Sequence, residues 1–164
     1  VSKKYAMTGW RIGWAVAPSK IAKAMGSLQS HSTSNPTSFA QWGALAALEG
    51  PQEPVEQMRQ EFQVRRDLIC QLADEIPGLS YYRPQGAFYL FVDMSPLVGK
   101  SYQGKLIDNG DTFAALLLEE AAVAVVPGGG FGKDNYLRLS YAISREQIQK
   151  GLSRIGEFVA KLEG

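Results

Sequence analysis

Residues Ser2–Gly13 read Ser-Lys-Lys-Tyr-Ala-Met-Thr-Gly-Trp-Arg-Ile-Gly, so two adjacent lysines precede a glycine-containing turn and an arginine. The amine of Lys3 or Lys4 could form a Schiff base with an aldehyde if it were held in place and partly neutral. The guanidinium of Arg11 could bind a phosphate through paired hydrogen bonds. Chemistry alone leaves a plainer interpretation open, in which the lysines are solvated charges and the arginine caps a strand.

The same segment resembles the cofactor-lysine signature of class I/II aminotransferases, a branch of the fold-type I enzymes that use pyridoxal 5'-phosphate (PLP). In that family the Schiff-base lysine follows a serine and precedes a phosphate-binding arginine by eight positions. Lys3 and Arg11 have this spacing, whereas Lys4 does not. The resemblance implies that Lys3 binds PLP covalently and then moves a proton, and that Arg11 binds the cofactor phosphate.

A second candidate site residue is Arg138, in the string Asn135-Tyr-Leu-Arg-Leu-Ser-Tyr-Ala142. Strand alternation places Leu137 and Leu139 on one face and Arg138 on the other. An arginine in mid-strand is costly to bury without a partner, so we expect an exposed or ion-paired side chain, or one that binds an anion. The string resembles the family's Arg-Leu-Ser-Tyr/Phe-Ala motif, which implies that Arg138 binds the substrate α-carboxylate.

Further segments agree with this family in order and spacing, so the resemblance covers essentially the whole chain. They are residues 33–41, the Pro-Gln-Gly-Ala-Phe-Tyr string of residues 84–89, and residues 125–132. The resemblance implies a PLP-dependent enzyme that moves an amino group between an amino acid and a 2-oxo acid, and a homodimeric full-length protein. Two alternatives stay open: a carbon–sulfur β-lyase of the same fold, and an isolated α/β domain without enzymatic activity.

The hydrophobic pattern predicts an α/β fold, with helices packed on a mixed sheet of about four strands. We expect residues 1–33 to be a remnant of a large cofactor-binding domain and residues 34–164 to form the small domain with its linking helices. Predicted strands cover residues 10–17, 79–82, 87–92, 123–126 and 136–141. Predicted helices cover residues 19–28, 35–48, about 55–76, 112–120 (capped by Asp111) and a last one capped by Ser144.

Composition excludes several classes of function. The formal net charge of +1 argues against a nucleic-acid or polybasic membrane surface, and no apolar run reaches the length of a membrane span. The single cysteine, Cys70, cannot form an intramolecular disulfide, and with one histidine, His31, it makes a metal site unexpected. We therefore expect no metal and a cytoplasmic location.

The chain opens on Val1 and enters the lysine motif at once, so we expect a piece of a longer enzyme. In the family, the acid partner of the pyridine nitrogen and the aromatic ring stacked on the cofactor come from before the lysine. The resemblance therefore implies that this chain alone is inactive.

Overall fold

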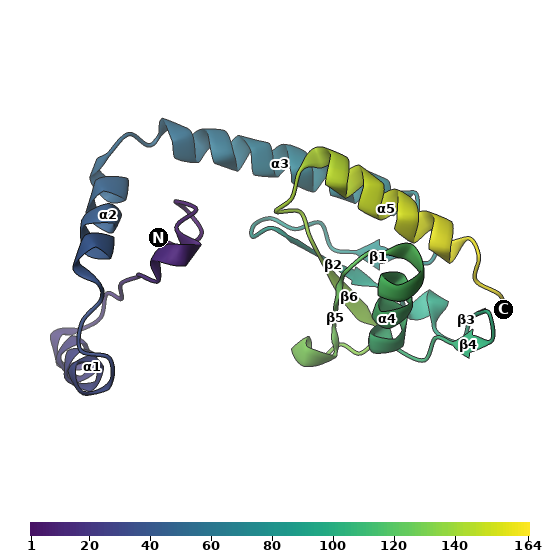
Figure 1. Cartoon of the computed structure of the whole chain (residues 1–164), viewed down its shortest axis with the longest axis horizontal. Coiled ribbons are helices and arrows are strands. Elements are labelled where there is room, and N and C mark those ends of the chain that lie inside the picture. Colours follow the sequence, from purple (N-terminus) through teal and green to yellow (C-terminus); the bar gives the residue numbers. More distant parts are fainter. The chain divides into compact units, whose positions relative to one another are not determined.

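The computed structural model describes residues 1–164, which form two compact units, Val1–Met58 and Arg59–Gly164 (Figure 1). The first unit is helical. It contains the 3-10 helix η1 (Thr8–Trp10), α1 (Ser19–Ser32), α2 (Ser38–Glu49) and the start of the long helix α3 (Glu53–Asp74).

The second unit combines the rest of α3 with a four-stranded sheet, in the order β1-β2-β6-β5, and a small hairpin. Its sheet strands are β1 (Ser80–Tyr81), β2 (Tyr89–Asp93), β5 (Val126–Pro127) and β6 (Tyr136–Ser140). The hairpin is β3 (Ser101–Tyr102) with β4 (Lys105–Leu106), and the other helices are η2 (Ser95–Leu97), α4 (Gly110–Ala121), η3 (Gly129–Phe131) and α5 (Arg145–Val159).

The expectation of four strands with helices packed on them is confirmed, but the sheet is antiparallel throughout and not mixed. The short links explain this, because a parallel pair needs a crossover of a dozen or more residues. Residues 82–88 join β1 to its neighbour β2, and residues 128–135 join β5 to its neighbour β6. The helical crossover through α4 joins β2 to β5, which are not adjacent.

Side-chain alternation along β2 and β6 gives the sheet one buried face. Leu90, Val92, Leu137 and Leu139 are at most 6% exposed and contribute to one hydrophobic core. The helices α3, α4 and α5 contribute further side chains to that core, as do residues outside them such as Met94, Ile107 and Tyr141. Figure 1 shows α3 and α5 running along one side of the sheet. Each fully buried leucine or valine stabilises the fold by about 1.5–3 kcal/mol. The sheet face gains this energy only when the helices cover it, so the two form together.

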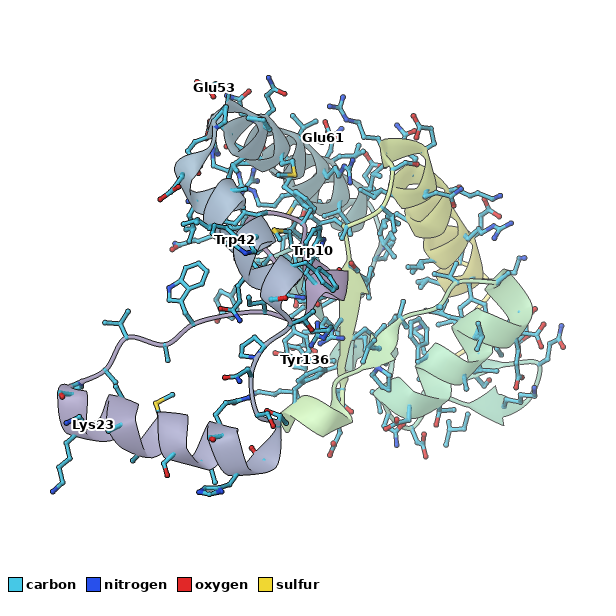
Figure 2. All side chains as sticks on the ribbon, turned by 60° about the vertical axis from the view of Figure 1, so that its left-hand side comes forward. Trp10, Lys23, Trp42, Glu53, Glu61 and Tyr136 are labelled. Carbon is cyan, nitrogen blue, oxygen red and sulfur yellow. The ribbon has the colours of Figure 1, made fainter.

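The first unit has a much smaller interior. Its buried hydrophobic side chains are Met7, Ala40 and Ala44, whereas Trp42 is 71% exposed. Figure 2 shows Trp10 and Trp42 among the side chains of this unit. Further exposed apolar side chains are those of Trp14, Val16, Ile21, Met25, Leu28, Phe39, Leu45 and Leu48. None of the helices in the chain combines the length and apolar character that a membrane span requires.

The strand predicted for residues 10–17 is wrong. Its start belongs to η1, and residues 11–18 have no regular secondary structure. A strand needs a neighbouring strand to satisfy its backbone groups, and Val1–Met58 contains none. The helix predicted over 19–28 continues to Ser32, whose hydroxyl donates to the carbonyl of Leu28 at 3.0 Å.

Two predicted helix starts also differ. The helix expected from Asn35 begins at Ser38, after Thr37 at its N-cap, and the carbonyl of Pro36 accepts from the Gln41 side chain at 2.9 Å. The helix α4 is capped by Asn109 and not by Asp111, because the Asn109 side chain accepts from the amide of Thr112. Which of several polar side chains caps a helix depends on which one reaches a free amide, and the residue types alone do not decide this.

The cap predicted for the last helix is confirmed. The Ser144 hydroxyl accepts from the amide of Gln147 at 3.3 Å. Beside this cap, Glu61 of α3 binds two arginines, Arg65 at 2.7 Å on its own helix and Arg145 at the start of α5. Glu61 therefore joins α3 to α5, and the hydrogen bond from Arg145, followed by that from Arg65, lowers its pKa from 4.5 to about 2.

The substitution Glu61→Gln should lower the free energy of unfolding at neutral pH. Because the pKa of Glu61 is lower in the folded chain, its carboxylate stabilises the fold fully above about pH 4.5, and this contribution is lost as the pH falls through about 2. The difference between wild type and E61Q should therefore shrink over that interval, as measured by urea unfolding at several pH values. Glu119→Gln, which breaks the more exposed pair with Lys105, is the control. A difference for E61Q that does not change with pH would contradict this account.

Candidate functional site

The segment that carries Lys3 is folded by local backbone hydrogen bonds. The amide of Tyr5 donates to the carbonyl of Val1 at 3.1 Å, and that of Ala6 donates to the carbonyl of Lys3 at 3.3 Å. These bonds make a tight turn around the lysine, whose side chain is exposed. Lys3 is thus an exposed residue on a folded turn.

Contacts with α2 and with Gln52, the residue before α3, anchor this turn. The ring of Trp10 lies against Gly43, where an added Cβ would come within 2.5 Å of the ring. The same ring meets Phe39 edge to face, with 6.3 Å between centroids. The hydroxyl of Tyr5 donates to the side chain of Gln52 at 3.2 Å. The lysine turn is therefore attached to the helices of its own unit by packing and by a hydrogen bond.

Arg11 has a strained backbone. Its φ is 50°, in the left-handed region, and Ala6 has a φ of 53°. For a residue with a Cβ this conformation costs about 1–2 kcal/mol. One guanidinium nitrogen of Arg11 donates to the carbonyl of Thr8 at 2.6 Å, and the side chain is exposed. Strain of this kind is common where a loop positions a ligand, which agrees with a binding role.

Arg138 lies in β6, the strand between β2 and β5, on the sheet face opposite the helices. Phe91 and Val126 are its cross-strand partners. The Cζ of Arg138 lies over the ring of Tyr89, 4.4 Å from the centroid, and over the ring of Phe131, 4.8 Å from the centroid. The arginine forms no ion pair, so only aromatic rings compensate its charge.

A tight loop places Phe131 over this arginine. The amide of Gly128 donates to the carbonyl of Tyr136 at 2.7 Å, and the amide of Phe131 donates to the carbonyl of Gly128 at 2.8 Å. An added Cβ at Gly128 would lie 2.2 Å from the carbonyl oxygen of Lys133 and 2.7 Å from the Cβ of Tyr136. Only glycine fits where the loop folds back on itself.

Sequence reasoning placed Tyr89 and Phe131 in segments that resemble the family but did not link either ring to Arg138. Both could have been suspected from the pattern. Tyr89 and Phe91 alternate with the buried Leu90, so they share the face of Arg138 across the strand pair. Nothing in the sequence of residues 128–136 shows that the loop turns back far enough to carry Phe131 over the arginine.

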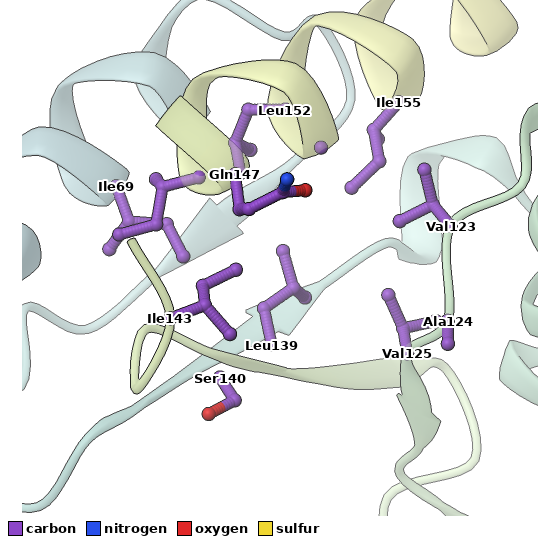
Figure 3. A pocket seen from close by; sticks show the side chains of 12 residues that line it. Ile69, Val123, Ala124, Val125, Leu139, Ser140, Ile143, Gln147, Leu152 and Ile155 are labelled. Atoms are coloured by element: carbon purple, nitrogen blue, oxygen red, sulfur yellow. The ribbon is translucent and has the colours of Figure 1, made fainter. Parts of the chain in front are cut away.

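A separate hollow of about 70 Å³ lies between α5, the end of β6 and the segment 123–125 that precedes β5 (Figure 3). Its lining is almost entirely aliphatic, as with Val123, Leu139 and Ile155, and its polar side chains are those of Ser140 and Gln147. It contains no charged group, so it offers no partner for a carboxylate or a phosphate. Arg138 is not among the residues that line it.

Residues 1–155 match the model of the family described as aminotransferase class I and II. This chain belongs to that family. The resemblance found in the lysine motif is therefore confirmed over nearly the whole chain. The family uses PLP as its cofactor.

Several relatives that the chain resembles are aspartate aminotransferases. It is 52% identical to the aspartate aminotransferase of Geobacillus stearothermophilus over 159 residues, which are 97% of this chain and 39% of that protein. It is 48% identical to the aspartate/prephenate aminotransferase of Cereibacter sphaeroides over 163 residues, 99% of this chain and 41% of that protein. The structure of the Rhizobium meliloti aspartate aminotransferase matches with a TM-score of 0.94 at 44% identity, covering 99% of this chain and 41% of that one. The chain thus spans about 40% of the length of its relatives.

Two side chains of the first unit have the functional groups that the family's cofactor requires. Lys3 supplies a primary amine, which an aldehyde requires, and Arg11 supplies the planar set of N–H donors that binds a phosphate. Both side chains are exposed and belong to Val1–Met58, whereas Arg138 belongs to Arg59–Gly164. The three predicted site residues are therefore divided between the two units.

Gly128→Ala should destabilise the second unit by about 1–3 kcal/mol, because the new methyl group meets backbone atoms that cannot move independently. Gly130→Ala is the matched control in the same loop, since an added Cβ there meets nothing within 4 Å. Urea unfolding of both variants measures the difference. Equal stability of the two variants would show that the loop tolerates a side chain at position 128.

Proposed function

We propose that this chain is part of a PLP-dependent aminotransferase that moves an amino group between an amino acid, with aspartate as the first candidate, and a 2-oxo acid. The observation that carries the proposal is Arg138, a guanidinium without a carboxylate partner, set among aromatic rings on the outer face of the sheet. Such a group matches the planar α-carboxylate that both kinds of substrate share. The names of the relatives support aspartate as the donor.

Lys3 and Arg11 have the other two roles in this proposal. The ammonium of Lys3 must lose its proton to react with an aldehyde, and the neutral amine can then accept and return a proton at the substrate Cα. Arg11 fixes the position of the cofactor by binding its phosphate. When bound, PLP serves as the sink for the electrons of the broken Cα–H bond.

The proposal also covers the partners and the location of the enzyme. Its partners are small molecules and, in the full-length protein, a second copy of the same chain, in the cytoplasm. The exposed apolar side chains of Val1–Met58 support burial against further protein, because aromatic groups such as Trp42 and Phe39 are rarely left in water as a contiguous patch.

The chain should form a covalent adduct with PLP at Lys3. After incubation with PLP and reduction with borohydride, peptide mapping should find the label on Lys3, and Lys3→Arg should remove it. Lys4→Arg is the matched control, because it changes the neighbouring lysine and should leave the labelling intact. Label spread over several lysines would contradict a specific cofactor site in this chain.

Arg138 should be required for transamination. We suggest replacing the matched segment of the Geobacillus stearothermophilus enzyme by this chain and measuring amino transfer from aspartate to a 2-oxo acid. Arg138→Ala should lower kcat/KM by about 10- to 100-fold, since hydrogen bonds to a charged group contribute about 1.5–3 kcal/mol.

The same hybrid protein separates the alternatives. Release of pyruvate and ammonia from a cysteine conjugate, without amino transfer, would show a carbon–sulfur β-lyase and contradict the assignment as an aminotransferase. If the hybrid that carries Arg138→Ala binds PLP and is fully active, the role proposed for Arg138 is contradicted and the roles of Lys3 and Arg11 are not.

A further inference from the structure

The surroundings of Arg138 differ from those of Arg145 in the same unit. Arg145 binds the carboxylate of Glu61, which neutralises its charge. Arg138 is half-buried in a central strand, where a charge without compensation is costly, yet no carboxylate binds it. Its compensation comes from the faces of Tyr89 and Phe131.

We propose that Tyr89 and Phe131 are positioning residues that fix the guanidinium of Arg138 so that it can bind a carboxylate. The inference rests on the proposed function, in which the carboxylate belongs to the substrate. Each ring attracts the guanidinium through the negative face of its π-system, which is worth about 0.5–1 kcal/mol at exposed sites and more when water is excluded.

Rings suit this task better than an acidic side chain would. A carboxylate from the protein would occupy the N–H donors of Arg138 and cancel its charge, so a substrate would have to displace it. The ring centroids lie 4.4 and 4.8 Å from the Cζ of Arg138. A ring face attracts the cation without accepting a hydrogen bond from it, so the N–H donors and the positive charge stay available. Restricting the long side chain in advance also lowers the entropy lost on binding.

The two rings are themselves held by neighbouring residues. The ring centroids of Tyr89 and Phe131 each lie within 5 Å of the Cζ of Arg138. Phe131 meets Phe91 edge to face, with 5.9 Å between centroids, and sits in the loop that Gly128 allows. Tyr89 is in regular β-structure and packs beside Phe88 at 4.3 Å.

The acidic side chain on this face of the two central strands is engaged elsewhere. Asp93 of β2 accepts from the amide of Ser95 at 2.8 Å and shares a hydrogen bond with Tyr136. That hydrogen bond raises the pKa of the Tyr136 hydroxyl above its ordinary value. Lys133 lies over the ring of Tyr136, 5.4 Å from the centroid, and adds a second positive charge to this face. Asp93 is therefore held by hydrogen bonds of its own and does not pair with Arg138.

Binding of succinate to the whole chain, followed by NMR of the Arg138 side-chain Nε–Hε group, tests the inference. In the wild type, ring currents from Tyr89 and Phe131 should shift this resonance, and succinate should move it further in a saturable way. Tyr89→Leu and Phe131→Leu should each weaken succinate binding about two- to fivefold and return the resonance toward the value of a free arginine. Tyr89→Phe and Phe131→Tyr keep the ring and should keep both properties.

Two further results separate this inference from the proposed function. Arg138→Lys keeps the charge but loses the forked donor set, so succinate should bind at least about tenfold more weakly. If Arg138→Lys binds like the wild type, both the carboxylate site and the positioning roles are overturned. If Arg138→Lys is impaired while both leucine variants, folded by their amide spectra, bind succinate like the wild type, only the positioning roles are overturned.

Discussion

The pairing of β2 with β6 is the constraint on which the rest of the second unit depends. Its register sets Phe91 opposite Arg138 and Leu90 opposite Leu139, so the leucines lie on the buried face and Arg138 lies with aromatic side chains on the other. A slip of one residue would bring the guanidinium into the core and expose the leucines. Packing of the helices on the buried face therefore also fixes where the arginine points.

Two arginines show how the same side chain serves stability or binding, according to its partner. Arg145 joins α3 to α5 through the carboxylate of Glu61, and both charges are satisfied within the chain. Arg138 rests against aromatic rings, which stabilise a cation without neutralising it. An arginine paired with a carboxylate is a structural contact, whereas an arginine packed against aromatic rings can still bind an anion.

Motifs and alternation were enough to predict the family, a sheet of four strands with helices packed on it, and the face of the strand on which Arg138 lies. They failed where the outcome depends on a neighbour distant in sequence or on a few atoms. The apolar run of residues 10–17 has strand composition but no strand beside it. The cap of α4 falls on Asn109 and not on Asp111 because of one side-chain hydrogen bond. Phe131 reaches Arg138 only because a loop folds back, which no local pattern encodes.

The loop after β5 also limits how this region can change through mutation. Position 128 faces two carbonyl oxygens and a Cβ so closely that every side chain other than hydrogen is excluded. Gly130, two residues along, faces open space. Substitutions that change the surface around Arg138 are therefore tolerated at the outer residues of the loop, whereas position 128 accepts only glycine. Altered specificity can arise here by exchanging side chains on a fixed turn, without rebuilding the turn itself.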